Sequence, residues 1–289
     1  MKGNMMEWGL TIPQAISHAE KYNFDGQLIS RELDGSIKKT TYGESIQRSK
    51  KLANALNKLG ITLHDTVATI AWNNSRHFET YFGVSGMGAI LHTLNPRYSP
   101  AQLVYILNHA EDKVLIIDPT FIPLVEGVQD QLNFVETIII AAEKSAIPEN
   151  NLNNACSYDD LLEQESSEYQ WPELNEDTSS ALCYTSGTTG QPKGVMLSHN
   201  NLISNVLDSE KRVPFENGKS KALSFLPICH VFERMILYLY QYCGVEIYFA
   251  ESIDKMTDNL KEVKPNVMTA VPRLYEKVYD KILEKGADL

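Results

Sequence analysis

The chain has 289 residues, of which 43% are hydrophobic and 22% are charged, enough apolar material for one large domain or two closely packed ones. The formal net charge of -11 repels polyanions, which excludes nucleic acid as a general partner. Any anionic ligand must therefore be held by a local group of residues.

Short apolar runs alternate with helical patterns, which predicts βαβ units and an α/β fold with mostly parallel sheets flanked by helices. Thr41 and Glu44 form a capping box that opens a helix, and Gly60 ends it. A buried strand is expected over 66–72. The helix expected over 77–90 contains glycines that indicate close packing against a neighbour.

A second helix start is found at Ser99, where a capping serine is followed by Pro100 and, three residues after the cap, by Gln102. The runs at 113–118 and 136–141 are rich in β-branched residues. Continuous apolar runs of this kind are typical of strands covered on both faces.

The composition changes between about residues 143 and 178, where a long surface connection with one short helix capped by Ser157 is expected. Two subdomains are predicted on either side of it, an N-terminal one over 1–175 and a truncated one over 176–289. The second subdomain has expected strands at 181–185, 222–226, 245–249 and 266–271, and expected helices near 200–209, 233–242, 253–263 and from 273 onward.

The four cysteines form no CxxC pair, so neither a zinc site nor a disulfide framework is expected. Reduced thiols in a cytosolic protein are the simpler interpretation. The first ten residues lack a signal-peptide pattern, and the most apolar segment, 235–250, is too short and too polar to span a bilayer. We expect a cytoplasmic protein and leave peripheral membrane contact open.

The most informative stretch is YTSGTTGQPKG at 184–194, which follows an apolar strand. Its glycines let backbone N–H groups approach a ligand, its Ser and Thr hydroxyls donate hydrogen bonds, and Lys193 adds positive charge. These groups suit a triphosphate, and one hydroxyl can reach a phosphate-bound Mg²⁺. Gly190 and Lys193 are separated by two residues, so the stretch is not a Walker A loop. The alternative is a polar, Gly-rich turn.

This stretch resembles the signature phosphate loop of the adenylate-forming superfamily, which includes acyl-CoA synthetases, luciferases and peptide-synthetase adenylation domains. LSFLPICHVFERM at 223–235 and NVMTAVPRLYEKVYDKI at 266–282 resemble later motifs of long-chain acyl-CoA synthetases. The segment from about 10 to 135 is most similar to bacterial homodimeric synthetases, and the segment after 196 to another long-chain branch. One hypothesis is a hybrid of two branches, and homodimerisation is left open.

The resemblance implies the N-terminal part of the large domain, without the C-terminal lid domain. The family's Mg²⁺-binding Glu, ribose-binding Asp and C-terminal adenylation lysine have no match. We therefore interpret the chain as an N-terminal fragment that is inactive alone.

For the complete enzyme, the resemblance implies a long-chain fatty acid–CoA ligase that uses ATP, Mg²⁺, CoA and a fatty acid. The acid becomes an acyl-adenylate with release of pyrophosphate, and CoA then displaces AMP. Thr185 is expected to provide the Mg²⁺-linked hydroxyl, and Lys193 and His230 are the expected catalytic residues, with His230 beside the acyl-adenylate. The groups expected to hold the phosphates are Thr185, Ser186, Gly187, Thr188, Thr189, Gly190 and Lys193.

Other residues of these motifs have plainer interpretations. His230 on its own could be a satisfied histidine at a strand end. Glu233 and Arg234 are expected to form a surface or helix-end salt bridge, and Arg273 either meets a CoA phosphate or forms a structural ion pair. Two further blocks, at 72–77 and 92–97, are interpreted as scaffold.

Three rival functions remain open. The protein could activate a different carboxylic acid, or it could be a non-catalytic nucleotide-binding module. An unrelated P-loop NTPase is disfavoured, because the Walker Ser/Thr is missing and no helix is expected directly after Lys193.

Overall fold

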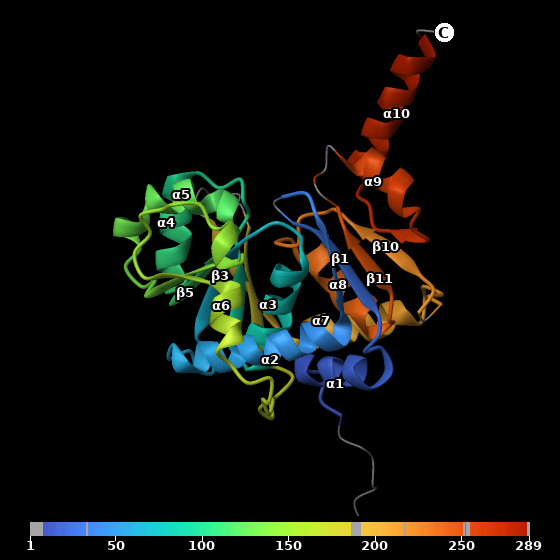
Figure 1. The fold of residues 1–289 in the computed structure, drawn as a ribbon. Helices are drawn as coiled ribbons and strands as arrows, with labels where there is room; N and C mark the ends of the chain where they lie inside the picture. Colours follow the sequence, from blue (N-terminus) through green and yellow to red (C-terminus); the bar gives the residue numbers. More distant parts are fainter. Residues whose placement is uncertain are drawn as a thin grey trace, which may run out of the picture.

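The structure, a computed structural model, describes residues 8–32, 34–185, 192–216, 218–250, 252 and 255–287. Within these residues the strands form two sheets (Figure 1). The larger sheet has the spatial order β7 (Ala155–Ser157), β6 (Thr137–Ile140), β5 (Val114–Ile117), β3 (Thr66–Ile70), β4 (Ile90–Thr93), β8 (Ser179–Thr185) and β9 (Lys193–Ser198). The smaller sheet has the order β12 (Val267–Met268), β10 (Lys221–Ser224), β11 (Glu246–Phe249), β1 (Gln27–Arg31) and β2 (Ile37–Thr41).

All strand pairs are parallel except β1 with β2 and β8 with β9. The prediction of a mostly parallel α/β fold is confirmed. Each sheet combines strands from both sides of the predicted boundary at residue 175, since β1 and β2 join β10–β12 while β8 and β9 join β3–β7. The sheets therefore do not follow that boundary.

The helices are α1 (Ile12–Tyr22), α2 (Tyr42–Lys58), α3 (Ser75–Gly86), α4 (Pro100–His109), α5 (Ile122–Glu126), α6 (Tyr158–Glu163), α7 (His199–Glu210), α8 (Val231–Tyr242), α9 (Met256–Val263) and α10 (Pro272–Ala287). Short 3₁₀ turns lie at Pro119–Phe121, Gln129–Gln131 and Lys144–Ala146. Among the described residues, none of these helices has both the length and the apolar character that a bilayer crossing requires.

Three apolar clusters define the layers. The largest lies between the two sheets and contains the buried faces of α1, α2, α3, α7 and α8. A second cluster packs α4 and α5 on the outer face of the larger sheet, and a third packs α9 on the smaller sheet. Figure 1 shows α10 projecting away from these layers.

The three helix starts that were predicted from capping residues are confirmed. Thr41 with Glu44 and Ser99 with Gln102 form reciprocal capping boxes at α2 and α4, and Ser157 caps α6. The helix expected over 77–90 instead covers 75–86, because Asn74 caps it through the His77 N–H and the chain turns at Gly88, whose φ is +89°.

Candidate functional site

The predicted phosphate loop joins two antiparallel strands, β8 and β9. In their register, the last paired residues are Thr185 and Lys193, so these two residues face each other across the base of the loop. Ser186, Gly187, Thr188, Thr189 and Gly190, the other predicted phosphate ligands, lie outside the described residues. No helix directly follows Lys193, as expected, because the strand β9 begins at this residue, whereas a P-loop NTPase has a helix at this point.

Tyr184 fixes the base of this hairpin to α4 and to the loop before it. Its hydroxyl lies 2.6 Å from Nδ1 of His109 in a hydrogen bond, and its carbonyl accepts a hydrogen bond from the Tyr98 hydroxyl at 3.3 Å. A side chain at Gly194 would lie 3.3 Å from the Tyr184 ring, which explains a glycine here. The strand that enters the loop is therefore held in place by side chains from outside the hairpin.

A buried histidine–aspartate pair lies behind Tyr184. Nδ1 of His92 is 2.6 Å from Oδ2 of Asp112, and both side chains are completely buried. The His92 ring centroid is 5.1 Å from that of Tyr184. Burial raises the pKa of Asp112, and the neighbouring His92 opposes that rise. The pair is part of the scaffold, as the sequence predicted for His92.

A cavity of about 400 Å³ lies at the carboxyl ends of strands from both sheets. Ala71 to Asn73 follow β3, Pro96 and Arg97 follow β4, and 225–229 follow β10. Ligands of open parallel sheets bind at such strand ends. Because β4 pairs directly with β8, this mostly apolar cavity lies one strand from the phosphate loop.

His230 directly follows the cavity wall and occupies the N-cap position of α8. Its backbone N–H donates to the carbonyl of Pro227 at 3.1 Å. Its side chain is exposed, and among the described residues the ring has no hydrogen-bond partner. The alternative of a histidine satisfied within its own protein finds no support, so the predicted role beside the acyl-adenylate stays a prediction.

The predicted surface salt bridge between Glu233 and Arg234 is wrong. Glu233 is 2% exposed and Arg234 is fully buried, because this turn of α8 lies between the two sheets. Oε1 of Glu233 accepts a hydrogen bond from the Ser224 hydroxyl at 2.6 Å, and burial raises the pKa of Glu233 to about 7. The Arg234 guanidinium instead lies 4.5 Å from the centroid of the Tyr81 ring, a cation–π contact.

Two other predicted residues have structural roles. Nη1 of Arg273 forms an exposed ion pair with Glu276 of the same helix at 2.8 Å, which supports the ion-pair interpretation. His77 is buried, with hydrogen bonds to the Thr69 hydroxyl at 3.0 Å and the Trp72 carbonyl at 3.1 Å. Burial lowers the pKa of His77 to about 3, so it is neutral scaffold.

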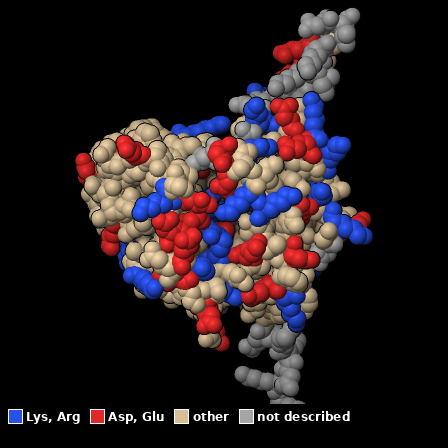
Figure 2. Space-filling model, viewed as in Figure 1, with Lys and Arg blue, Asp and Glu red and all other residues tan. Residues whose placement is uncertain are grey.

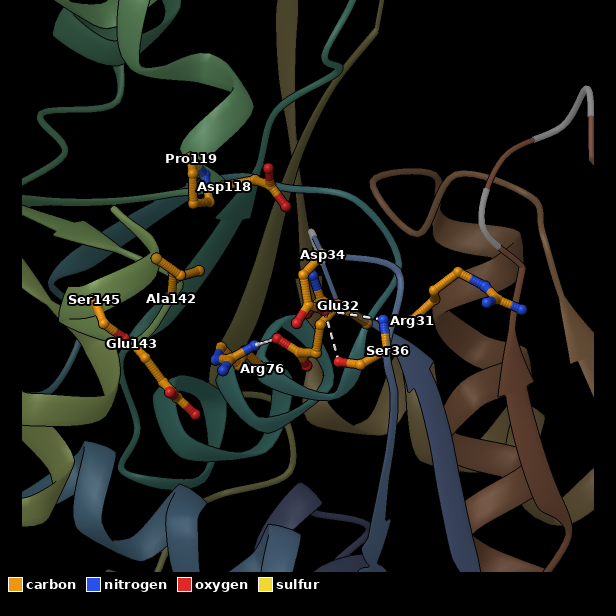
Figure 3. Close-up of a pocket in the computed structure, with 13 residues that line it drawn as sticks. Arg31, Glu32, Asp34, Ser36, Arg76, Asp118, Pro119, Ala142, Glu143 and Ser145 are labelled. Carbon is orange, nitrogen blue, oxygen red and sulfur yellow. Dashed lines mark hydrogen bonds and ion pairs between the residues drawn. The ribbon is translucent and has the colours of Figure 1, made fainter. Parts of the chain in front are cut away.

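A larger polar cavity of about 530 Å³ lies further along the same edge of the larger sheet, beyond β5 and β6 (Figure 3). Figure 3 shows Arg76 paired with Glu32, at 2.6 Å, and Ser36 bonded to Asp34. Three strand steps, about 14 Å, separate β5 from β8. Because Arg76 is already paired with Glu32 and the phosphate loop is distant, the smaller cavity is the better candidate site.

Asn73 and Arg97, which belong to the two blocks interpreted as scaffold, line the smaller cavity. Both stand just beyond the carboxyl end of a parallel strand, and that position alone could have identified them.

A family model described as AMP-binding enzyme matches residues 18–288. The chain belongs to this family. It is 40% identical over 232 residues to the 3-methylmercaptopropionyl-CoA ligase of Ruegeria lacuscaerulensis, covering 80% of this chain and 43% of that relative. It is 44% identical over 199 residues to the long-chain-fatty-acid–CoA ligase of Thermus thermophilus, covering 69% of this chain and 35% of that relative.

The fold of this AMP-binding family member also matches solved structures. The crystal structure of the anthranilate CoA ligase AuaEII in complex with anthranoyl-AMP superposes with a TM-score of 0.79 at 19% identity, covering 93% of this chain and 51% of that one. The chain spans about two fifths of the length of the curated relatives it matches.

Proposed function

We propose that this chain is the N-terminal part of an AMP-forming acyl-CoA ligase, and that it holds ATP and a carboxylic acid for adenylation. The observation that carries the proposal is the hairpin that sets Thr185 opposite Lys193, at the base of the signature loop and one strand from the apolar cavity. Family membership and fold support it.

In the proposed reaction the carboxylate of the acid attacks the α-phosphate of ATP, and pyrophosphate leaves. The thiol of CoA then attacks the acyl carbonyl, and AMP leaves. The chain contributes by placing two anions together and stabilising the charge that moves onto pyrophosphate. Lys193 supplies positive charge at the loop, and His230 borders the reacting carboxylate.

Mg²⁺ fits this site only together with the nucleotide. Among the described residues there is no cluster of three His, Cys, Asp or Glu side chains that could hold a metal. Mg²⁺ in phosphate sites keeps waters and binds few protein ligands, so one hydroxyl, that of Thr185, suits it. When bound, the ion neutralises phosphate charge.

The acid we propose is a long-chain fatty acid, on the basis of the 223–235 motif. The relatives' names favour different acids, since one of them is a ligase for 3-methylmercaptopropionate and another for long-chain fatty acids. A panel of acids in an ATP–pyrophosphate exchange assay, extending from short thioether acids to palmitate, decides between them.

Binding of Mg²⁺–ATP tests the loop assignment directly. We expect Lys193→Ala combined with Thr185→Ala to weaken binding to the 289-residue chain at least tenfold, about 1.4 kcal/mol, because a charge-assisted contact and a metal-linked hydroxyl are lost. Isothermal titration calorimetry measures the affinity. Lys211→Ala is the matched control. It removes an exposed lysine at the C-terminal end of α7, the end that is further from the loop along the chain, and the variant should bind as wild type does.

Unchanged ATP affinity in the double variant would rule out the loop assignment. The chain alone is expected to show no acyl-CoA formation, and turnover by the pure 289-residue protein would contradict the proposal that it needs the rest of the enzyme.

A further inference from the structure

The segment between β10 and α8, residues 225–230, forms one wall of the candidate cavity and ends at His230. It continues from β10 of the smaller sheet, yet side chains from α3 and from β4 of the larger sheet hold it in place. The Tyr81 hydroxyl donates to the carbonyl of Ile228, and the Thr93 hydroxyl donates to the carbonyl of Cys229 at 3.2 Å. The wall is therefore docked across the space between the sheets.

Asn73 makes most of the contacts in this docking. Its Nδ2 donates to the carbonyl of Leu226 at 2.7 Å and to the Ser224 hydroxyl at 3.2 Å. Its Oδ1 accepts a hydrogen bond from the N–H of Ile228 at 3.3 Å. One side chain, placed just after β3, thus binds the wall segment at two points and the last residue of β10 at a third, and it also lines the cavity.

Ser224 and Glu233 reinforce the orientation of the Asn73 amide that the Leu226 carbonyl and the Ile228 N–H already require. The Ser224 hydroxyl has a single hydrogen, and it donates this hydrogen to Oε1 of Glu233 at 2.6 Å. Only a lone pair of Ser224 then faces Asn73, so Asn73 must present its NH₂ group there. That orientation leaves Oδ1 pointing at the N–H of Ile228. Ser224 and Glu233 are 1% and 2% exposed, so water does not compete.

We infer that Asn73 is a positioning residue for the proposed adenylation, which fixes the cavity wall and His230, and that Glu233 acts through Ser224 to support the Asn73 amide. The effect of Asn73 on catalysis rests on the proposed function. Its effect on the position of the wall segment can be measured without any enzymatic turnover.

Hydrogen exchange of the 289-residue chain, followed by mass spectrometry on peptides within 224–233, tests the positioning. Asn73→Ala should raise the exchange rate of the Ile228 amide at least tenfold, because its acceptor is lost. Asn73→Asp, which has the same size and keeps an acceptor for Ile228 but no donor, should loosen the segment less. Ser224→Ala should also increase exchange, because the Asn73 amide loses that support.

Asn23→Ala is the matched control. Asn23 is more buried than the half-buried Asn73 and donates to the carbonyls of Gln241 and Tyr242, at the opposite end of α8. Its loss should leave exchange at 224–233 unchanged. The inference is overturned if Asn73→Ala leaves this segment protected. It is also overturned if Asn73→Ala and Ser224→Ala both raise exchange equally throughout α8 and the sheets.

A non-hydrolysable acyl-adenylate analogue, a fatty-acyl sulfamoyladenosine, tests the link to the site. We expect Asn73→Ala to weaken its binding at least tenfold while the affinity for Mg²⁺–ATP changes less than threefold, because the phosphate loop is held by other residues. Equal weakening of both would show a general structural role. If wild type binds neither ligand, the proposed function fails, and the exchange result still decides whether Asn73 positions the wall.

Discussion

At the scale of single residues, Glu233 and Arg234 are adjacent in the chain, charged and both buried. Two adjacent charged residues near a helix start are typical of a solvent-exposed turn, and their sequence neighbours gave no other signal. Their burial follows from where α8 lies, between the sheets, which no local pattern encodes. Charged residues are seldom buried without ion partners, so the burial of these two side chains lowers the stability of the folded state.

The buried carboxyl of Glu233 makes stability depend on pH. Its pKa is about 7 in the folded protein, mainly through burial, against 4.5 for an exposed carboxyl. The folded state therefore binds more protons than the unfolded state between these values, and stability falls as pH rises from 4.5 to 7. The Ser224 hydroxyl and, along α8, the Tyr240 phenol are the groups that influence it, and neither carries charge in this range.

Glu233→Gln should remove this dependence. We expect the free energy of unfolding of the variant, relative to wild type, to rise by about 3 kcal/mol between pH 4.5 and pH 8. Urea denaturation at several pH values measures it. A constant difference between the two proteins across this range would contradict the raised pKa.

At the scale of elements, the sequence predicted α2, α4 and α6 from their polar caps and β3, β5 and β6 from continuous apolar runs. It missed α1, whose N-terminal Thr11 makes no side-chain cap hydrogen bond, and the short strands β1, β4 and β7. It also missed the edge strands β2 and β9, whose side chains are largely exposed. These strands form because their edges pair with β1 and β8, so the information lies in distant parts of the chain.

The glycines of α3 were predicted to allow close packing, and they do. A Cβ at Gly83 would lie 2.9 Å from Cδ2 of Leu52 and 3.0 Å from the backbone carbonyl oxygen of Ser49, both in α2. Contacts this short force a shift, and a backbone carbonyl in the middle of a helix moves little.

Gly83→Ala should therefore destabilise the protein. Alanine favours a helix over glycine by about 1 kcal/mol, but overpacking costs about 1–3 kcal/mol, so we expect a net loss of about 1 kcal/mol. Thermal and urea unfolding give the value. Gly286→Ala in α10, where a Cβ would meet nothing within 4 Å, should cause no loss. A gain in stability for Gly83→Ala would mean that α2 and α3 separate easily.

At the scale of the whole molecule, the sequence predicted the layered α/β class but not how the chain is shared between sheets. The candidate site was likewise only partly predictable from the sequence. The phosphate loop was evident from its composition, whereas the cavity wall depends on Asn73 meeting Leu226 and Ile228. The surface view in Figure 2 shows acidic side chains over α6 beside basic ones over β1 and β2.

An ion network joins the two halves of the molecule. Arg76 of α3 pairs with Glu32, just after β1, at 2.6 Å and with Asp159 of α6 at 2.8 Å. Asp159 also pairs with Arg48 of α2 at 2.5 Å. Arg76 and Asp159 are buried, so salt screens their interaction weakly.

Arg76→Met should cost about 3 kcal/mol of stability, because it leaves buried carboxylates short of a counter-charge. Asp159→Asn should cost less after Arg76 is removed than in wild type, with a coupling of about 1–3 kcal/mol in a double-mutant cycle. Lys211→Met, which breaks an exposed pair with Asp208, is the control and should change stability by less than about 1 kcal/mol. Strictly additive losses for Arg76 and Asp159 would show that they act independently.

The parallel pairing of Leu28 with Ile247 constrains how the protein folds during synthesis. β1 emerges early from the ribosome, but its neighbour β11 is translated only near the end of the 289 residues. Until then the β1–β2 hairpin has an open edge, and an isolated hairpin is marginally stable. The edge of β1 that pairs with β11 therefore stays open while residues 42–245 are translated, so the two N-terminal strands gain their full stability only after β11 is made.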